Sequence, residues 1–124
     1  MERDLSTALQ RAIEAGDQVL TAEVMPPRGA DPSHMLAMAA SLQGRVHAVN
    51  VTDGSRAVMR MSSLASCKLL LEAGLQPVLQ MACRDRNRIA LQADLLGAHA
   101  LGIRNLLCLT GDPVRAGDQA DARP

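Results

Sequence analysis

Four glycines divide this sequence at intervals of about thirty residues, and this periodicity is its strongest constraint on the fold. Each glycine follows a helix-like pattern and precedes a short apolar run; the four are Gly16, Gly44, Gly74 and Gly102. Glycine is common just past the end of a helix because it adopts the left-handed conformation without strain. The spacing therefore predicts helices that alternate with strands.

The strands are expected in the apolar runs, at residues 19–24, 48–52, 77–82 and 106–110. These runs are short and partly β-branched, which is typical of parallel strands covered on both faces. The helices are expected at residues 6–15, 31–42, 62–73 and 87–101. Strand alternating with helix at this period indicates an α/β fold of βα units around a parallel sheet, preceded by a lead-in helix.

Capping residues and apolar spacing describe the helices further. Ser6 is the expected N-cap of the first helix, and Asp31-Pro32 is expected to start the second, because a capping residue followed by proline suits a first turn. Met35 and Met38 follow helical spacing and are expected in the core rather than around a cofactor. The last helix is apolar on much of its circumference, so we expect it to be well buried.

Two architectures accommodate these units. A (β/α)8 barrel needs about 250 residues, so this chain supplies about half of one, whereas a small doubly wound sheet closes with roughly this many units. The dinucleotide fingerprint GxGxxG and the phosphate loop GxxxxGK[ST] follow none of the expected strands. Periodicity alone leaves both architectures open.

The charge balance and the absence of targeting segments exclude several classes of protein. The 13 basic and 13 acidic residues cancel, which removes the bulk electrostatic argument for binding nucleic acid or an anionic membrane. The first residues lack the basic-then-apolar pattern of a signal peptide, and no apolar run reaches the ~20 residues of a membrane span. We therefore expect a cytoplasmic protein.

Neither thiols nor imidazoles indicate a metal site. Three widely spaced cysteines fit neither a disulfide framework nor a CxxC motif, so reduced thiols are expected at Cys67, Cys83 and Cys108. The histidines lack ligand spacing and are interpreted as surface or locally bonded residues; they are His34, His47 and His99. Because Phe, Tyr and Trp are absent, aliphatic residues and seven Met must fill the core.

The chemically versatile residues follow the expected strands. In either architecture the carboxyl ends of the strands form the site, and residues 22–29, 51–55, 80–87 and 109–113 lie there. Glu23 is the sharpest case because it interrupts an apolar strand, where an unpaired carboxylate is costly. An apolar setting favours the protonated form of a carboxyl group, which suits a general acid. Pairing of Glu23 with a Lys or Arg from a neighbouring strand is an equally good interpretation.

Three further segments at these ends have both structural and functional interpretations. Residues 52–55 and 110–113 have turn composition and are each more typical of βα turns, although their place on the rim with Glu23 favours a site. The basic run 84–88 stands at a helix N-terminus, where an anion can bind. A solvated loop whose charges pair with one another is the better interpretation of its composition.

In this order, the strand ends resemble the methylenetetrahydrofolate reductase family, over essentially the whole chain and closest to a bacterial branch. The most specific stretches are Glu23 with Pro26-Pro27, and residues 51–55, 83–88, 95–98, 102–105 and 110–113. The resemblance implies a (β/α)8 TIM barrel that binds a flavin, usually FAD, with FMN as the alternative. Such oxidoreductases reduce 5,10-methylenetetrahydrofolate to 5-methyltetrahydrofolate in one-carbon metabolism and methionine biosynthesis. NADH, NADPH or another electron donor reduces the flavin.

The resemblance also implies roles by position. Glu23 corresponds to the acid that protonates the folate as its imidazolidine ring opens, and Asp112 to a residue near the pterin and the flavin. Flavin contacts fall on Thr52, Leu109 and Thr110. Two departures bear on the form of the cofactor. Gln80 stands where some members carry a flavin-contacting histidine, and Thr110 stands where some carry an arginine.

Finally, the resemblance implies that residues 1–124 form the amino-terminal half of the barrel and stop after its fourth strand. We expect such a half to expose an edge strand and a wide apolar inner face, and to be inactive alone. The alternatives are a non-catalytic subunit that completes its barrel with a partner chain or a second copy, and a pterin-dependent methyltransferase-like barrel. The expected partners are a folate substrate and either further copies of the chain in a homo-oligomer or a second chain that completes the barrel, with no nucleic acid or membrane.

Overall fold

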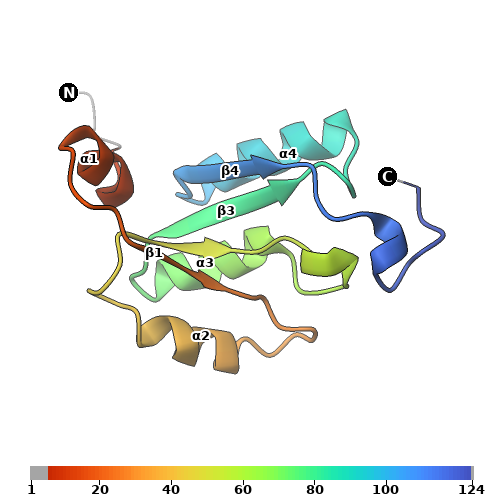
Figure 1. Cartoon of the computed structure of the whole chain (residues 1–124), viewed down its shortest axis with the longest axis horizontal. Helices are drawn as coiled ribbons and strands as arrows, with labels where there is room; N and C mark the ends of the chain where they lie inside the picture. Colours follow the sequence, from red (N-terminus) through yellow and green to blue (C-terminus); the bar gives the residue numbers. More distant parts are fainter. Residues whose placement is uncertain (1–5, 124) are drawn as a thin grey trace.

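A single parallel sheet organises the chain, and its strands lie side by side in sequence order (Figure 1). The computed structural model describes residues 6–123. The strands are β1 (Thr21–Val24), β2 (Ala48–Val51), β3 (Pro77–Ala82) and β4 (Asn105–Leu109). A doubly wound sheet reverses its strand order at a switch point, and the order β1-β2-β3-β4 has no such reversal. The arrangement is therefore consistent with part of a TIM barrel.

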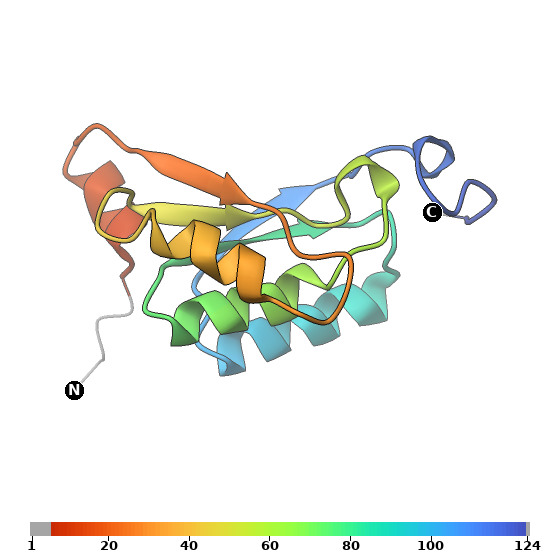
Figure 2. The same ribbon diagram turned by 90° about the horizontal axis from the view of Figure 1, so that it is seen from below.

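Three helices cover one face of the sheet, and the opposite face is left open (Figure 2). The described residues form the helices α1 (Ala8–Glu14), α2 (Ser33–Ala40), α3 (Ser63–Glu72) and α4 (Arg88–Ala100), with short 3-10 turns η1 (Ser55–Ala57) and η2 (Val114–Ala116). Of these, α2, α3 and α4 pack against the covered face of the sheet, whereas α1 lies at the amino ends of the strands (Figures 1 and 2). The four expected strands and four expected helices are confirmed, with boundaries that differ by a few residues.

The strand register assigns alternate residues to the two faces. Glu23 lies level with Asn50, Asn50 with Val78, and Val78 with Asn105, so these four residues form one row across the sheet. The residues between them face the helices because strand side chains alternate. The core on that side includes Val49, Val51, Leu79, Met81, Cys67 and Leu70, together with Met35 and Ala39 from α2.

The helix ends follow local capping rules, with two corrections to the expected starts. Thr7, rather than Ser6, caps α1, because its hydroxyl accepts a hydrogen bond from the Gln10 amide at 3.1 Å. Helix α2 begins at Ser33, with Pro32 in the cap position. Asp31 precedes it and accepts bonds from the amide and hydroxyl of Ser33 at 2.9 and 2.5 Å. In both helices the predicted N-cap residue thus lies one position before the observed N-cap.

Several apolar residues that were expected in the core are exposed instead. Met38 is 54% exposed, although Met35 is buried as expected. Helix α4 buries only Ala98, and Leu96 is 74% exposed, so the prediction of a well-buried helix was wrong. Its apolar circumference has too few neighbours in residues 6–123 to cover it. The expected exposed edge strand is confirmed, because no residue of β4 is fully buried.

The open face of the sheet is more polar than expected. Its central row contains Glu23, Asn50 and Asn105 beside a single apolar residue, Val78. The expected exposure of the inner face is confirmed (Figure 2), but the face is mixed rather than wholly apolar, because Leu107 of β4, 46% exposed, lies on it as well. The expectation that both faces are covered was wrong (Figure 2). In the described residues, no helix is long and apolar enough to cross a membrane.

Candidate functional site

A hollow of about 320 Å³ lies at the carboxyl ends of the strands. Its lining comes from all four strand ends and comprises Glu23, Thr52, Asp53, Ser55, Gln80, Arg84, Leu109, Gly111 and Asp112. The structure thus brings together five of the six residues singled out from sequence. Thr110 is the exception, because it lines an apolar groove between β4 and α4 with Leu106 and Cys108. Successive side chains of an extended segment point to opposite faces, so Thr110 points away from the hollow that Leu109 lines.

Glu23 stands on the wall of this hollow without a charged partner. It belongs to β1, lies level with Asn50 and is exposed. Among the described residues no ion pair involves Glu23, so the interpretation as a glutamate paired with a Lys or Arg of a neighbouring strand finds no support. The surroundings also differ from the apolar enclosure that the sequence suggested. The carboxyl group faces an open, mixed surface and is free to contact a ligand.

Two buried polar residues lie beside Glu23. Thr52 is 5% exposed, and its hydroxyl oxygen has no hydrogen-bond partner among the described residues. Gln80 is 9% exposed, and its backbone carbonyl accepts a 2.9 Å bond from the buried hydroxyl of Ser63 on α3. An unpaired hydroxyl in a protein interior costs free energy unless water or a ligand satisfies it. Thr52 is therefore the residue of this hollow most in need of a polar partner.

Asp112 holds a strained turn at the rim. Its Oδ2 accepts a 2.6 Å hydrogen bond from the backbone amide of Arg56. Arg56 and Ala57 have φ values of 61° and 57°, in the left-handed region that side-chain-bearing residues rarely adopt. Such conformations persist only where the surroundings hold them. One carboxylate oxygen of Asp112 is therefore engaged in structure while its residue lines the hollow.

The comparison with protein families decides the assignment. Residues 8–124 match the family model described as methylenetetrahydrofolate reductase. The chain belongs to this family. A search among curated proteins found no match. Membership of the methylenetetrahydrofolate reductase family is consistent with an oxidoreductase acting in folate metabolism, and with the sheet order described above.

In this member of the methylenetetrahydrofolate reductase family, Asp53 is a structural residue. Its Oδ2 accepts bonds from the Ala82 amide at 2.8 Å and from Arg86 Nη1 at 2.5 Å. Arg86 in turn donates to Asp94 of α4 at 2.9 Å and to the Ala82 carbonyl at 2.7 Å. The turn after β2 is thereby fastened to the end of β3. This supports the turn interpretation of residues 52–55 for Asp53, while Thr52 lines the hollow.

The basic run 84–88 is solvated in part, as its composition predicts. Asp85, Asn87 and Arg88 are exposed, whereas Arg84 is buried and Arg86 is partly buried. Arg84 is 6% exposed and pairs with Asp85 through Nε at 2.9 Å and Nη2 at 2.5 Å. The hydrogen bond from Arg84 lowers the pKa of Asp85. Arg86 has 13% of its side chain exposed, whereas Arg88 is exposed on α4. The charges pair with one another, as expected, but one guanidinium group is buried and a second is largely covered.

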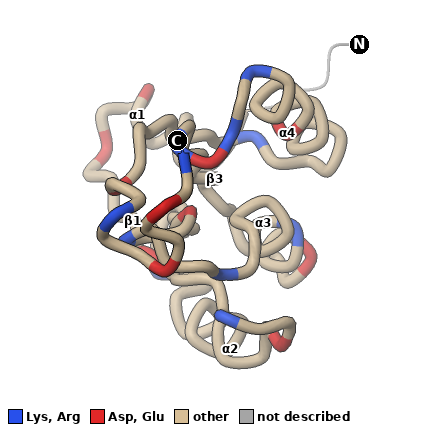
Figure 3. The backbone as a smooth tube through the Cα atoms, turned by 90° about the vertical axis from the view of Figure 1, so that its right-hand side faces the viewer, with Lys and Arg blue, Asp and Glu red and all other residues tan. Residues whose placement is uncertain are grey.

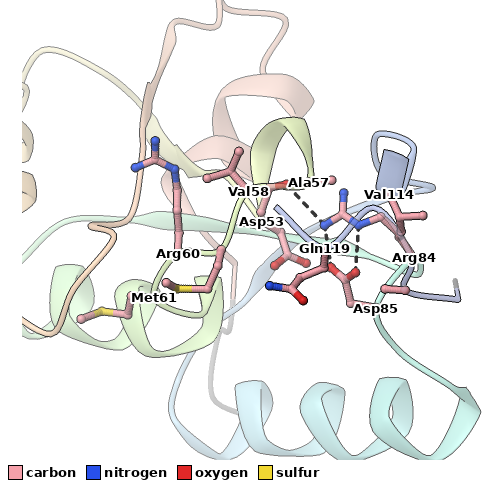
Figure 4. A pocket seen from close by; sticks show the side chains of 12 residues that line it. Asp53, Ala57, Val58, Arg60, Met61, Arg84, Asp85, Val114 and Gln119 are labelled. Carbon is pink, nitrogen blue, oxygen red and sulfur yellow. Dashed lines mark hydrogen bonds and ion pairs between the residues drawn. The ribbon is translucent and has the colours of Figure 1, made fainter. Parts of the chain in front are cut away.

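A second hollow, of about 280 Å³, lies next to the first (Figure 4). It is bounded by residues 53–61, by Arg84 and Asp85, and by residues 114–122. Asp118 joins the two loop segments, since its amide donates to the Ala57 carbonyl at 3.3 Å and its carboxylate accepts from the Met59 amide at 2.9 Å. Viewed toward the carboxyl ends of the strands, acidic and basic segments alternate around this end of the molecule (Figure 3).

The remaining sequence expectations concern metal ions and thiols. Residues 6–123 contain no group of three or more His, Cys, Asp or Glu that is placed to hold a metal ion. All three cysteines are unpaired, as expected. His47 is locally bonded, because its Nδ1 accepts a 3.1 Å hydrogen bond from the Leu20 amide. Sequence reasoning missed Arg84 as a part of the site, although two glycines, Gly54 and Gly111, mark the space that it fills.

Proposed function

We propose that this chain contributes to a flavin-dependent reductase that converts 5,10-methylenetetrahydrofolate to 5-methyltetrahydrofolate. One observation carries the proposal: Glu23, Thr52, Gln80 and Asp112 line one hollow at the carboxyl ends of a parallel sheet in a member of this family. Carboxyl ends of parallel strands are where such folds place their chemistry. The donor that reduces the cofactor is NADH, NADPH or another reductant.

The residues of the hollow fit a flavin. The ring system of a flavin presents carbonyl oxygens and ring nitrogens along one edge and a flat apolar face. The unpartnered hydroxyl of Thr52 and the amide of Gln80 would meet the polar edge, and Leu109 would lie against the apolar face. When bound, the cofactor supplies the hydride that reduces the one-carbon unit of the folate. FAD is the proposed form, and FMN is the alternative.

Glu23 is proposed as the general acid. The five-membered ring of the substrate must open before its one-carbon unit can accept a hydride, and ring opening leaves a nitrogen that needs a proton. Glu23 has no ion-pair partner in the described residues and lies on the wall of the hollow, so its carboxyl group is available to donate. A proton held at the right position lowers the barrier of such a step by about 3–5 kcal/mol.

Asp112 is proposed to orient the substrate. Its Oδ2 accepts the Arg56 amide, which leaves Oδ1 to accept hydrogen bonds from the pterin. A carboxylate at this position also places negative charge near the pyrimidine edge of the flavin, which disfavours a reduced, anionic cofactor. The hydrogen bond to Arg56 would keep this charge at a fixed place on the rim.

We further propose that the sheet is one half of a (β/α)8 barrel. The free edge of β4, the open polar face and the exposed apolar residues of α4 are all features that further strand–helix units would cover. These units come from the same protein or from a second chain, including a second copy of this one. Glu23 and Asn50 would then line the interior of a closed barrel.

Flavin binding by the purified chain tests the fit. We expect FAD to be retained through gel filtration and Thr52→Val to weaken its affinity by about fivefold, since a hydrogen bond contributes about 1 kcal/mol. Thr21→Val is the matched control. Thr21 is exposed on the open face of the sheet, but it lies at the amino end of β1, away from the hollow. Equal affinity of the two variants would remove Thr52 from the site.

Catalysis tests the role of Glu23. In the assembled barrel, Glu23→Gln is expected to lower folate reduction by about 10²–10⁴-fold while the donor still reduces the flavin at the wild-type rate. Rapid-mixing absorbance of the flavin separates the two half-reactions. Wild-type folate turnover in this variant would contradict the acid assignment.

A further inference from the structure

One guanidinium group ties together the three loops that carry the candidate site. Arg84, just after β3, donates from Nη2 to the Gly54 carbonyl at 3.3 Å and from Nη1 to the Asp112 carbonyl at 3.2 Å. The first carbonyl belongs to the loop after β2, and the second to the loop after β4. The side chain of Arg84 is 5% exposed and lines the hollow of Glu23 and the neighbouring hollow of Figure 4.

Two glycines leave the space that this guanidinium occupies. A Cβ at Gly54 would lie 2.7 Å from Arg84 Nη2, and a Cβ at Gly111 would lie 3.1 Å from Nη1. Both glycines also have positive φ, at 57° and 92°. Each loop therefore presents bare backbone to Arg84, and a side chain at either position would displace it.

The charge of Arg84 is balanced by a carboxylate that lies outside the hollow of Glu23. Asp85 takes two of its hydrogen bonds, and the Asp85 side chain is 54% exposed. Two acidic groups of the hollow, Glu23 and Asp112, form no ion pair with Arg84 among the described contacts, and the third pairs with Arg86 instead. The hydrogen bond from Arg84 to Asp112 goes to the backbone carbonyl, and Arg84 attracts the carboxylate without a hydrogen bond to it. The Asp112 carboxylate bonds the Arg56 amide and keeps one oxygen for a ligand.

We propose that Arg84 is a positioning residue of this site, which fixes the Asp112 carboxylate relative to Glu23 by clamping the loops after β2 and β4 onto the end of β3. The proposal rests on the proposed function for the ligand that Asp112 meets. The geometry of the clamp is independent of that ligand. Lysine does not replace arginine here, because a single ammonium group cannot span two carbonyls and a carboxylate in the planar fork geometry.

The clamp is tested first in the chain without any ligand. In Arg84→Met, backbone ¹⁵N order parameters at Gly54, Arg56 and Asp112 are expected to fall from about 0.85 to below about 0.6, while those of β2 and β3 stay unchanged. Arg84→Lys is expected to behave like Arg84→Met. Arg88→Met is the matched control, because Arg88 belongs to the same run and is exposed. Rigid loops in Arg84→Met would overturn the proposal whether or not the chain binds flavin.

The link to Asp112 is tested by folate affinity, because the Asp112 carboxylate is proposed to hold the pterin. Titration of the flavin-loaded chain with 5-methyltetrahydrofolate is expected to show about a tenfold weaker affinity for Arg84→Met and no change for Arg88→Met. If Arg84 acts through Asp112, its replacement in an Asp112→Asn background lowers the affinity by less than twofold. Equal losses in both backgrounds would mean a merely structural role and would overturn the proposal. If the wild-type chain retains no flavin, the proposed function fails at this stage, and the order parameters decide on the clamp alone.

Discussion

The helix–strand pairs α3–β3 and α4–β4 have similar apolar sequence patterns, yet the first pair is buried and the second is exposed. All six residues of β3 are buried, whereas no residue of β4 is. Helix α3 buries four residues and α4 buries one. β3 has a strand on each side, whereas in residues 6–123 β4 has a neighbouring strand on one side only. Apolar composition thus determines what an element is able to bury, and the number of its neighbours determines what it does bury.

Thiol chemistry should show this contrast most strongly. Burial raises the pKa of Cys67, on α3, to about 12. Relative to an ordinary thiol this lowers the thiolate population by roughly a thousandfold at neutral pH, and access is blocked as well. Cys83 and Cys108 are exposed. A thiol reagent at pH 8 is expected to modify two of the three cysteines of the folded chain and the third only after unfolding. Rapid labelling of all three would mean that α3 is not packed as described.

Truncation of core residues should separate the two units next. Leu79 of β3 is 1% exposed and Leu96 of α4 is 74% exposed. Leu79→Ala is expected to lower the free energy of unfolding by about 2–5 kcal/mol, and Leu96→Ala by no more than about 0.5 kcal/mol. Urea unfolding followed by circular dichroism measures both. A large loss for Leu96→Ala would indicate that a second copy or another chain covers α4 in solution.

Loss of the N-cap should destabilise α3 and α4 equally, because a capping hydrogen bond is local and does not depend on how deeply the helix is buried. Ser62 caps α3 with a bond from the Ala65 amide at 3.2 Å, and Asn87 caps α4 with a bond from the Ala90 amide at 3.0 Å. Replacement of either by Ala is expected to cost about 1 kcal/mol. The same unfolding measurement compares the two variants. A cost confined to Ser62→Ala would show that α4 frays at its start whether or not it is capped.

The smallest effect concerns the salt bridge that follows β3. Arg84 lowers the pKa of Asp85 below its unfolded value, so the pair stabilises the fold above that value, and the stabilisation is lost as pH falls through the folded pKa. Because Asp85 is about half exposed, Asp85→Asn is expected to cost less than about 1 kcal/mol at pH 7. The difference from wild type should shrink below about pH 4. A difference that stays constant down to pH 3 would exclude the pair as its source.

The sequence was sufficient to predict elements with strong local signals. Strand β3 spans the predicted residues 77–82, because an apolar run bounded by a glycine and a charged segment is a local feature. The glycines after the four helices all have positive φ, as the capping rule predicts. The placement of Glu23, Thr52, Gln80 and Asp112 in one hollow followed from strand order and from the family resemblance together.

Long-range pairing could not be read from the sequence. The burial of Arg84 depends on carbonyls at Gly54 and Asp112, which are 30 and 28 residues away. The side of the sheet on which Thr110 falls depends on the exact end of β4, and the expected strand ended one residue late. The exposure of α4 depends on what lies next to it rather than on its own apolar pattern.

The hydrogen bond between Thr7 and Asn105 has a consequence for the order of folding. Thr7 caps α1 and also donates to Asn105 Oδ1 at 2.8 Å, so the first helix is fastened to the last strand across 98 residues of sequence. Contacts between residues so far apart form late, because a long loop must close first. During synthesis, this bond can form only after Asn105 has been made and β4 has been positioned. Its formation therefore reports the moment at which the fourth strand joins the sheet.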